Sequence, residues 1–304
     1  MSKIVVFGSI NTDLVINTNK MPKNGETIYG GKFFISQGGK GANQAIAASM
    51  LGGKVDLIAC IGRDSFGYES LSNLKMKNVN TSNIRLIDNV SSSVAMIIRF
   101  DNDNRIILGD GSNNYLESND LRNYFNKNSD GGIFVTQLEN KKDVIIEAIK
   151  IAKEHNMFTI FNPTPAIALE EDVYKYIDLL VINQTESEIL SDIYPKNRHD
   201  CKSVYDHFRK LGIKNLIITL GKIGSLVFEN ENMVIIEGHK VEAVDSTGAG
   251  DCYIGALAYG LSIGWDITKS SRLASIASAI SVTKVGAQSG MPTIEEVNKF
   301  IEGD

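Results

Sequence analysis

The stretch DSTGAGDCYIGALAYGLSI, residues 245–263, joins a glycine-rich turn to a helical pattern that covers 250–263. A turn of this kind leaves several backbone N–H groups without partners at the start of a helix. Together with the helix dipole, these groups form a binding site for anions, most commonly phosphate. Asp251 stands in the first helical turn, where a carboxylate would repel a phosphate but could accept a proton from an attacking hydroxyl. The alternative is a glycine-rich helix start with an aspartate cap.

Apolar runs and helical patterns alternate along most of the chain around this stretch. The apolar runs are rich in Val, Ile and Phe, as strands buried on both faces of a sheet are, and they cover 3–7, 55–61, 133–138, 157–161, 179–182 and 216–220. The helical patterns cover 42–51, 141–155, 185–191, 203–211, 250–263 and 267–284. This alternation predicts a mostly parallel sheet with helices on both faces.

Two segments depart from the alternation. Residues 13–36 and residues 92–109 each contain two short β-type runs, and the second segment has an Asp-Asn-Asp-Asn turn at 101–104. Both segments are typical of β-hairpins inserted between α/β units. We expect the two hairpins to pair into one small sheet that serves as a lid, as a dimer surface, or as both.

Composition excludes several classes of protein. The chain has 304 residues and a formal net charge of −5, so it has no overall basic field for nucleic acid or an anionic membrane. No run approaches the roughly 18 apolar residues of a membrane span, and MSKIVVFGSI at the start is typical of a buried strand. Three cysteines and four histidines show neither a disulfide framework nor the spacing of a zinc site. We therefore expect a cytoplasmic protein.

Two further motifs lie near the N-terminus. QGGKGAN at 37–43 begins the helical pattern over 42–51, and its glycines would let a ligand approach the backbone closely. Lys40 and Asn43 offer polar groups for hydroxyls or phosphate oxygens; the alternative is a flexible helix start with a solvated lysine.

GSINTD at 8–13 follows the first strand, at the strand end where open α/β sheets bind ligands. Asn11 and Asp13 would point the same way and suit vicinal hydroxyls, unless the motif is only an Asx-type turn.

Two motifs follow later strands. NQTE at 183–186 begins a helix, and Glu186 could reach phosphates only through a cation, which suggests Mg²⁺ with its waters. The alternative is an ordinary N-terminal cap with a glutamate in the first turn. TLGKIG at 219–224 could surround a nucleotide or could be a β-turn between two strands.

The P-loop, the protein-kinase motifs and the dinucleotide fingerprint after the first strand are absent from the sequence. Cys252 has no histidine in any motif to activate it, so we interpret it as structural.

In this order, the five motifs resemble those of the PfkB family of sugar kinases, also called the ribokinase family. GGKGANQAIAA at 38–48 resembles the family's first signature, and DSTGAGDCYIGA at 245–256 resembles its second. The resemblance runs from about residue 3 to residue 300. GSINTD, with TQLE at 136–139 and KVGAQ at 284–288, is most similar to the family members that phosphorylate ribose.

The resemblance implies a fold and a reaction. The fold would be a ribokinase-like three-layer α/β/α sandwich, one domain over 1–304, with a mostly parallel central sheet and a small β-sheet lid from about 13–36 and 92–109. In this family the lid often clasps a second subunit, so a homodimer is expected. The implied reaction is ATP-dependent phosphorylation of the primary hydroxyl of D-ribose, which gives ribose 5-phosphate and ADP.

The resemblance also implies roles for residues that match the family's motifs. Asp251 would be the catalytic base, and the backbone N–H groups of Gly248, Ala249 and Gly250 would form an anion hole. Residues that would hold the sugar, besides Asp251, are Asn11, Asp13, Gly39, Lys40, Asn43 and Glu139. Residues expected near the nucleotide are Asn183, Thr219, Gly221, Gly224, Gly250 and Ser275. Glu186 with Asn183 would organise Mg²⁺ through water, and a monovalent cation, usually K⁺, would lie by Asp245, Thr247, Ser281, Lys284, Gly286 and Gly290.

Three positions depart from the family pattern. Gln184 replaces the usual acidic residue after Asn183, Ser275 stands where Asn or His is frequent beside the adenine, and Gly290 stands where a serine often contributes to the cation site. Potassium is still expected, because most ligands there would be backbone carbonyls.

Three alternative functions stay open at this point. The first is a related kinase of the same family that acts on 2-deoxyribose, fructose or another small sugar, on a nucleoside, or on a sugar acid. The second is a non-catalytic sugar-binding regulator with the same fold, against which the intact Asp251 and its glycine-rich turn argue. The third is a dinucleotide oxidoreductase, which would fit the α/β alternation but lacks the fingerprint.

Overall fold

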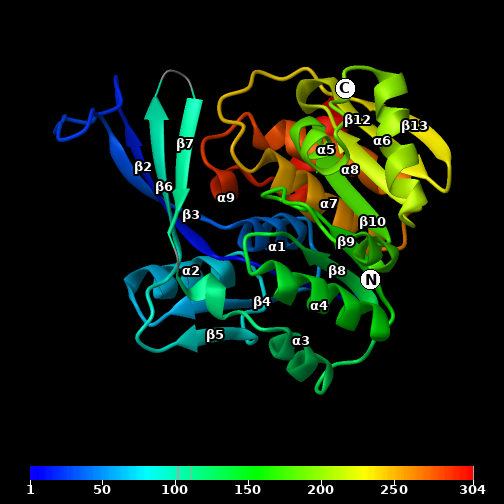
Figure 1. Cartoon of the computed structure of the whole chain (residues 1–304), viewed down its shortest axis with the longest axis horizontal. Coiled ribbons are helices and arrows are strands. Elements are labelled where there is room, and N and C mark those ends of the chain that lie inside the picture. The colour runs from blue at the N-terminus through cyan, green and yellow to red at the C-terminus, as the bar shows by residue number, and fades with distance from the viewer. Residues whose placement is uncertain (101–102, 110, 304) are drawn as a thin grey trace.

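A nine-stranded sheet forms the centre of the computed structural model, which describes residues 1–100, 103–109 and 111–303 (Figure 1). The strand order is β13-β12-β11-β10-β9-β8-β1-β4-β5, parallel from β11 to β5, with β12 and β13 antiparallel at one edge. The strands are β1 (Ile4–Phe7), β4 (Val55–Gly62), β5 (Ile84–Ile87), β8 (Gly132–Thr136), β9 (Met157–Phe161), β10 (Leu179–Asn183), β11 (Asn215–Thr219), β12 (Gly224–Glu229) and β13 (Asn232–Glu237). The predicted mostly parallel sheet is confirmed.

Side chains that alternate along the central strands feed two separate hydrophobic clusters. On β1, Ile4 and Val6 pack into one cluster, while Val5 and Phe7 pack into the other, as the two-residue period of a strand requires. The first cluster includes residues of α1 (Lys40–Met50), α2 (Ser65–Met76), α7 (Ala249–Ser262), α8 (Ile267–Ser281) and α10 (Ile294–Gly303). The second includes residues of α3 (Ser118–Phe125), α4 (Lys142–Glu154) and α6 (Arg198–Lys210). Helices therefore cover both faces, which confirms the three-layer sandwich.

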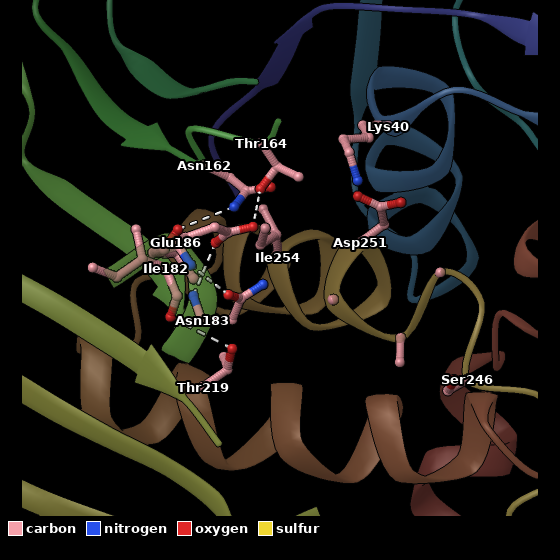
Figure 2. Close-up of a pocket in the computed structure, with 14 residues that line it drawn as sticks. Lys40, Asn162, Thr164, Ile182, Asn183, Glu186, Thr219, Ser246, Asp251 and Ile254 are labelled. Carbon is pink, nitrogen blue, oxygen red and sulfur yellow. Dashed lines mark hydrogen bonds between the residues drawn. The ribbon is translucent and has the colours of Figure 1, made fainter. Parts of the chain in front are cut away.

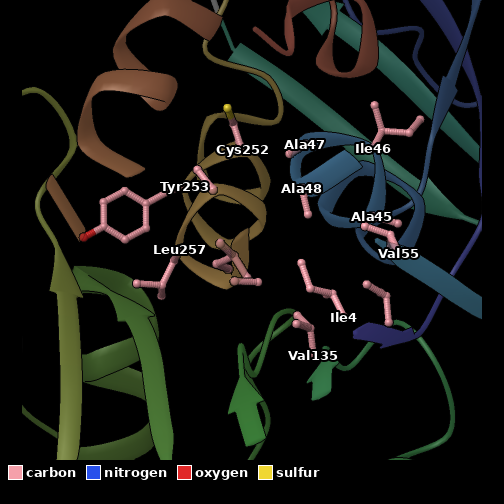
Figure 3. Close-up of a cluster of buried hydrophobic side chains, with 14 of the residues drawn as sticks. Ile4, Ala45, Ile46, Ala47, Ala48, Val55, Val135, Cys252, Tyr253 and Leu257 are labelled. Carbon is pink, nitrogen blue, oxygen red and sulfur yellow. The ribbon is translucent and has the colours of Figure 1, made fainter. Parts of the chain in front are cut away.

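Helices α1 and α7 cross closely above the sheet (Figure 3). Small residues make this possible: a Cβ at Gly255 of α7 would lie 2.5 Å from the Cβ of Ala47 and 2.5 Å from the backbone oxygen of Gln44. Ala45, Ala47 and Ala48 of α1 are buried in the same cluster. The N-terminal turns of the two helices, which carry two of the sequence motifs, are thus held against one another.

The two departing segments form a second sheet that projects from the core (Figure 1, upper left). Its order is β3-β2-β6-β7, where β2 (Asn11–Asn17) pairs antiparallel with β3 (Phe33–Gly38) and β6 (Val94–Phe100) with β7 (Asp103–Leu108). The central pair, β2 and β6, is parallel. The small lid sheet is confirmed, but the strand expected within 27–35 is shifted to β3, and residues 101–102 of the predicted turn lie outside the described residues.

Other elements differ from the prediction for local reasons. Helix α6 begins five residues earlier than its apolar pattern, because the Asn197 side chain caps it by accepting from the N–H groups of His199 (2.9 Å) and Asp200 (3.0 Å). Helices α2 and α3 were not predicted; the described residues that they bury are Gly67, Ser70 and Leu74 in α2 and Leu121, Tyr124 and Phe125 in α3. The remaining elements are α5 (Gln184–Ser191), α9 (Ala287–Gly290), and the 3₁₀ turns η1 (Ser112–Tyr115), η2 (Glu171–Tyr176) and η3 (Gly221–Ile223). Among the described residues, no helix has both the length and the apolar character needed to cross a membrane.

Candidate active site

Asp251 lies in the first turn of α7 and is held by two amides of α1. Its Oδ2 accepts a hydrogen bond from Asn43 Nδ2 (2.8 Å), and its Oδ1 accepts one from Gln44 Nε2 (3.0 Å). The side chain is buried. Gly248 precedes the helix with a φ of 79°, a left-handed conformation that favours glycine. The predicted juxtaposition of a glycine-rich helix start and a carboxylate is therefore present.

A cavity of about 220 Å³ opens beside Asp251 (Figure 2). Residues from four of the five motifs line it: Lys40, Asn183, Glu186, Thr219, Gly248, Ala249, Gly250 and Asp251. These four motifs converge because two of them follow the parallel strands β10 and β11 and the other two begin helices α1 and α7. Ala249 N–H already donates to Ser246 O (3.2 Å), so this predicted anion donor has a partner within the turn.

Three predicted nucleotide residues lie outside the lining of this cavity. Gly224 has a φ of 115°, and a Cβ there would lie 2.0 Å from Ile236 O. The backbone at this position therefore requires a glycine whether or not a nucleotide binds nearby. Gly221 belongs to η3 and has open space beside its Cα. Ser275 is buried on α8, where its hydroxyl donates to Glu237 O at 3.4 Å.

Glu186 combines the two interpretations of its motif. It forms a capping box with Asn183, in which Glu186 N–H donates to Asn183 Oδ1 (2.9 Å) and Asn183 N–H donates to Glu186 Oε2 (2.9 Å). Thr164 donates its hydroxyl to the other carboxylate oxygen (Figure 2). Burial raises the pKa of Glu186, although these hydrogen bonds and Lys40 act in the opposite direction. The cap therefore also fixes an acidic group on the wall of the cavity.

Lys40 connects this cavity with a second pocket. Its side chain points toward Asp251 (Figure 2), and its backbone N–H donates to Glu139 Oε2 (2.9 Å). Burial alone would lower the pKa of Lys40, but the nearby carboxylates of Asp251, Glu139, Glu186 and Asp13 raise it overall. Lys40 is thus held as a cation among acids.

The second pocket measures about 190 Å³ and lies under the lid. It is lined by Asn11, Ser93, Leu108, Gly109, Gly111, Asn113, Asn114, Leu138, Glu139, Asn140, Lys141 and Pro165. Glu139 accepts from Ser9 Oγ (2.5 Å) and from Asn11 Nδ2 (3.4 Å), while Asn113 Nδ2 donates to Asn11 Oδ1 (2.7 Å). Amide and carboxylate groups in so small a pocket suit the hydroxyls of a small sugar.

Asp13 lies near this pocket on the inner face of the lid. Burial, together with the charges of Glu139 and Asp251, raises the pKa of Asp13 to about 7, while Lys40 opposes this shift. Two glycines make room for the strand: a Cβ at Gly38 would lie 2.5 Å from the Asp13 carboxylate, and one at Gly39 would lie 2.6 Å from Asn11 N. Gly39 also has a φ of 89°.

The predicted monovalent-cation residues gather around Asp245. Its Oδ1 accepts from Thr247 N (3.0 Å) and Thr247 Oγ1 (2.6 Å), and its Oδ2 accepts from Gly286 N (3.1 Å). Ser281 O at the end of α8, Lys284 in the loop that follows and Gly290 at the end of α9 adjoin one another. Arg99 of the lid also reaches Asp245 Oδ2 at 3.4 Å.

Several residues at the site were not predicted. Asn162 and Thr164 line the first cavity, and Asn113 orients Asn11 in the second. Asn162-Pro-Thr follows β9, so its place after a parallel strand was a usable signal. Asn113 and Gln44 had no such signal, because their partners are far away in the sequence.

Similarity in sequence and in fold connects this chain with sugar kinases. The model of the pfkB family carbohydrate kinases matches residues 1–294. The ribokinase of Schizosaccharomyces pombe is 37% identical, covering 98% of this chain and 97% of the relative. A deoxyribokinase of Salmonella typhi is 34% identical, covering 98% of each. The structure of Arabidopsis thaliana ribokinase complexed with ribose and ATP superimposes with a TM-score of 0.91 at 27% identity, covering 99% of both chains. This chain belongs to the pfkB family of carbohydrate kinases.

Proposed function

We propose that this chain transfers the γ-phosphoryl group of ATP to the primary hydroxyl of D-ribose, giving ribose 5-phosphate and ADP. The observation that carries the proposal is the placement of Asp251 at the glycine-rich start of α7, with Lys40 linking its cavity to a small polar pocket. The similarity to ribokinases over nearly the whole chain supports ribose as the substrate.

In this mechanism, the sugar occupies the pocket under the lid. Of the six residues assigned to the sugar from the sequence, Asn11 and Glu139 line this pocket. Lys40 lines the cavity beside Asp251, and we propose that it reaches the sugar from there together with Asp13, Gly39 and Asn43. Asp251 takes the proton from the primary hydroxyl as this hydroxyl attacks the phosphorus, a contribution of roughly 10²–10⁴-fold. Lid closure keeps out water, which would otherwise compete as the acceptor.

The nucleotide phosphates lie at the start of α7 in this proposal. Gly248 and Gly250 offer backbone N–H groups to the transferring group, and Lys40 adds a positive charge. The Ala249 N–H, which donates to Ser246 O, would join them by exchanging this partner for a phosphate oxygen. Asn183 and Thr219 line the same cavity. For Gly221, Gly224 and Ser275, which lie outside its lining, we propose a place farther along the bound nucleotide.

Magnesium suits the donors in this cavity. Among the described residues, no group of three or more His, Cys, Asp or Glu side chains is placed to hold a metal ion. This fits Mg²⁺, which proteins commonly bind through one or two carboxylates together with water and substrate phosphates. Glu186, supported by Asn183, would hold the ion through water. When bound, Mg²⁺ would neutralise charge on the ATP phosphates.

A monovalent cation, K⁺ in our proposal, fits the loops around Asp245. The Gly286–Asp245 hydrogen bond joins the two loops, so a carboxylate and backbone carbonyls of one small region could act as oxygen ligands. The residues assigned to the site are Asp245, Thr247, Ser281, Lys284, Gly286 and Gly290. The cation would share the Asp245 carboxylate with Arg99.

We also propose a homodimer through the lid. Strand register places Ile35, Leu14, Met96 and Ile107 in one row across the sheet, on the face opposite to Asp13. Ile35, Met96 and Ile107 are exposed, and an exposed apolar surface of this kind is typical of a protein–protein interface.

A cytoplasmic location is proposed from the three cysteines, which are free and buried. We propose no nucleic-acid or membrane partner.

A 2-deoxyribose kinase is the second candidate, because the Salmonella deoxyribokinase is nearly as similar as the ribokinases. Fructose or another small sugar, and a non-catalytic sugar-binding role, stay further alternatives. Asn11 separates the first two: a site that binds the 2-hydroxyl through Asn11 would discriminate against the sugar that lacks it.

The test is ADP release from ATP and Mg²⁺, with K⁺ present, on ribose, 2-deoxyribose, fructose, adenosine and 2-keto-3-deoxygluconate. A reaction without sugar serves as the control for ATP hydrolysis. We expect the highest kcat/KM on ribose. The highest kcat/KM on another sugar would replace the substrate but keep the kinase, and silence on all of them with sugar binding intact would favour the regulator.

A further inference from the structure

A chain of buried amides runs from the central sheet to Asp251. Gln137, directly after β8, donates from Nε2 to Gln44 Oε1 (2.6 Å), and Gln44 donates from Nε2 to Asp251 Oδ1 (3.0 Å). Gln137 is 0% exposed and Gln44 is 1% exposed. Gln137 is therefore connected to Asp251 through Gln44, although Gln137 is not among the residues that line either proposed substrate cavity.

A second chain reaches the other carboxylate oxygen. Asn73 of α2 donates to Gln288 Oε1 (2.6 Å), Gln288 donates to Asn43 Oδ1 (2.9 Å), and Asn43 donates to Asp251 Oδ2 (2.8 Å). Gln288 Nε2 also donates to Gly38 O at 3.2 Å. Each oxygen of Asp251 is thus the end of its own amide chain.

The carboxylate dictates the direction of every amide in both chains. An ionised carboxylate only accepts, so Gln44 and Asn43 must turn their NH₂ groups toward Asp251. Their carbonyl oxygens then face outward and require donors, which Gln137 and Gln288 supply. A side chain without an NH₂ group in place of Gln137 or Gln288 would leave the carbonyl oxygen of the inner amide without this donor. The inner amide would then be held from the Asp251 side alone, with the added bond from Gln44 Nε2 to Asn162 Oδ1 (3.5 Å) in the first chain.

Gln137 shows that this arrangement has a cost. Among the described residues, its Oε1 is buried without a hydrogen-bond partner. It lies against Gly8, where an added Cβ would be 2.2 Å from Oε1. Buried amide oxygens are normally paired, so a glutamine here is poorly explained by packing alone. Its NH₂ group is the part that the structure uses.

We propose that Gln137 and Gln288 are positioning residues, which fix the Asp251 carboxylate through Gln44 and Asn43 so that it faces the attacking hydroxyl. The proposal rests on the proposed function, because it assigns the carboxylate its task as a base. Neither residue would bind the sugar through its side chain.

The main test compares Gln137→Met with Gln137→Glu and with the control Thr136→Val. Met keeps the size but removes the donor, so we expect kcat on the fastest sugar to fall about tenfold to hundredfold while the sugar KM changes little. Glu can only accept when ionised, so it would turn Gln44 around and reduce kcat further. Thr136 is also fully buried beside Gln137 and donates to Phe7 O (2.8 Å), so its variant should keep kcat. Wild-type kcat in Gln137→Met, with a folded protein by thermal unfolding, would overturn the proposal.

A second measurement is independent of activity. In Asp251→Ala, the side-chain amide NMR signals of Gln137 and Gln288 should shift, although neither residue contacts Asp251 directly. Unchanged signals would overturn the proposed positioning of Asp251 by the two amide chains, even if the wild-type enzyme phosphorylates ribose. Shifted signals, with a wild-type protein that phosphorylates no sugar, would support the amide chains and reject the proposed function.

Discussion

The two ends of the proposed active site are built in opposite ways. The Asp251 end is part of the larger hydrophobic cluster, where α1 and α7 cross through alanine and glycine and both carboxylate oxygens are hydrogen-bonded. Among the lid residues that the structure describes, the buried core consists of Val15, Ala95 and Ile97, with Phe34 packed against it. Its outer face exposes Ile35, Met96 and Ile107 instead of burying them.

The difference indicates a division of tasks. A group that must meet the phosphorus in a fixed orientation benefits from a rigid, buried setting. A sheet with a small core can move or dock onto a partner at lower cost, as a lid must do to admit and release a sugar. We therefore expect changes at the Asp251 end to act on turnover and changes at the lid end to act on sugar binding.

The largest effect is expected for Asp251→Asn, at the rigid end. The shape is kept but the proton acceptor is lost, so kcat should fall by about 10²–10⁴-fold. Calorimetric titration should still detect sugar and ATP binding, because asparagine keeps the size of the side chain and the other residues that line the two cavities are unchanged. Near-normal turnover would exclude Asp251 as the base.

Next in size is Gly255→Ala, which tests the helix crossing itself. The new Cβ would meet the backbone oxygen of Gln44 at 2.5 Å, so α1 and α7 must separate. We expect the free energy of unfolding in urea to fall by about 1–3 kcal/mol, with a loss of kcat. Gly303→Ala, where the space is open, is the control. Equal stability of the two variants would show that the crossing is not tight.

Asp13→Asn tests the lid end through pH. The pKa of Asp13 is raised from 3.8 to about 7 in the folded protein, so the folded state holds this proton more tightly than the unfolded state does. As pH rises from about 4 to 7, Asp13 therefore lowers the stability of the folded wild-type protein. Asparagine cannot ionise, so the variant should gain stability relative to the wild type by roughly 1–3 kcal/mol between pH 5 and pH 8, allowing for partial exposure. Urea unfolding at the two pH values measures the gain; a pH-independent difference would contradict the shift.

The smallest effect is expected for Arg99→Ala, which removes the contact between the lid and Asp245. This pair is partly exposed and 3.4 Å long, so its contribution should be about 1 kcal/mol or less. The sugar KM should rise a few-fold, and the rise should shrink when tetramethylammonium chloride screens the pair. Arg105→Ala on the neighbouring strand is the control. An identical rise in both variants would point to a general weakening of the lid.

Much of this fold followed from local patterns in the sequence. Buried parallel strands such as β4 have continuous apolar runs, and motifs at the strand ends meet because the strands are parallel. Hydrogen bonds between distant side chains leave no such pattern: Gln44 lies 93 residues from Gln137 and 207 from Asp251. The roles of Gly221, Gly224 and Ser275 stay predictions, because all three lie outside the lining of the cavity beside Asp251.

The position of the phosphate on the product tests the central proposal most directly. Wild-type enzyme would be incubated with ATP, Mg²⁺, K⁺ and ribose, and the product examined by ³¹P and ¹³C NMR. We expect ribose 5-phosphate, with phosphorus coupling to the C5 carbon, because the primary hydroxyl is the one that should face Asp251. Phosphate on the anomeric carbon or on a ring hydroxyl would contradict this orientation, and the absence of any sugar phosphate would contradict the assignment of ribose.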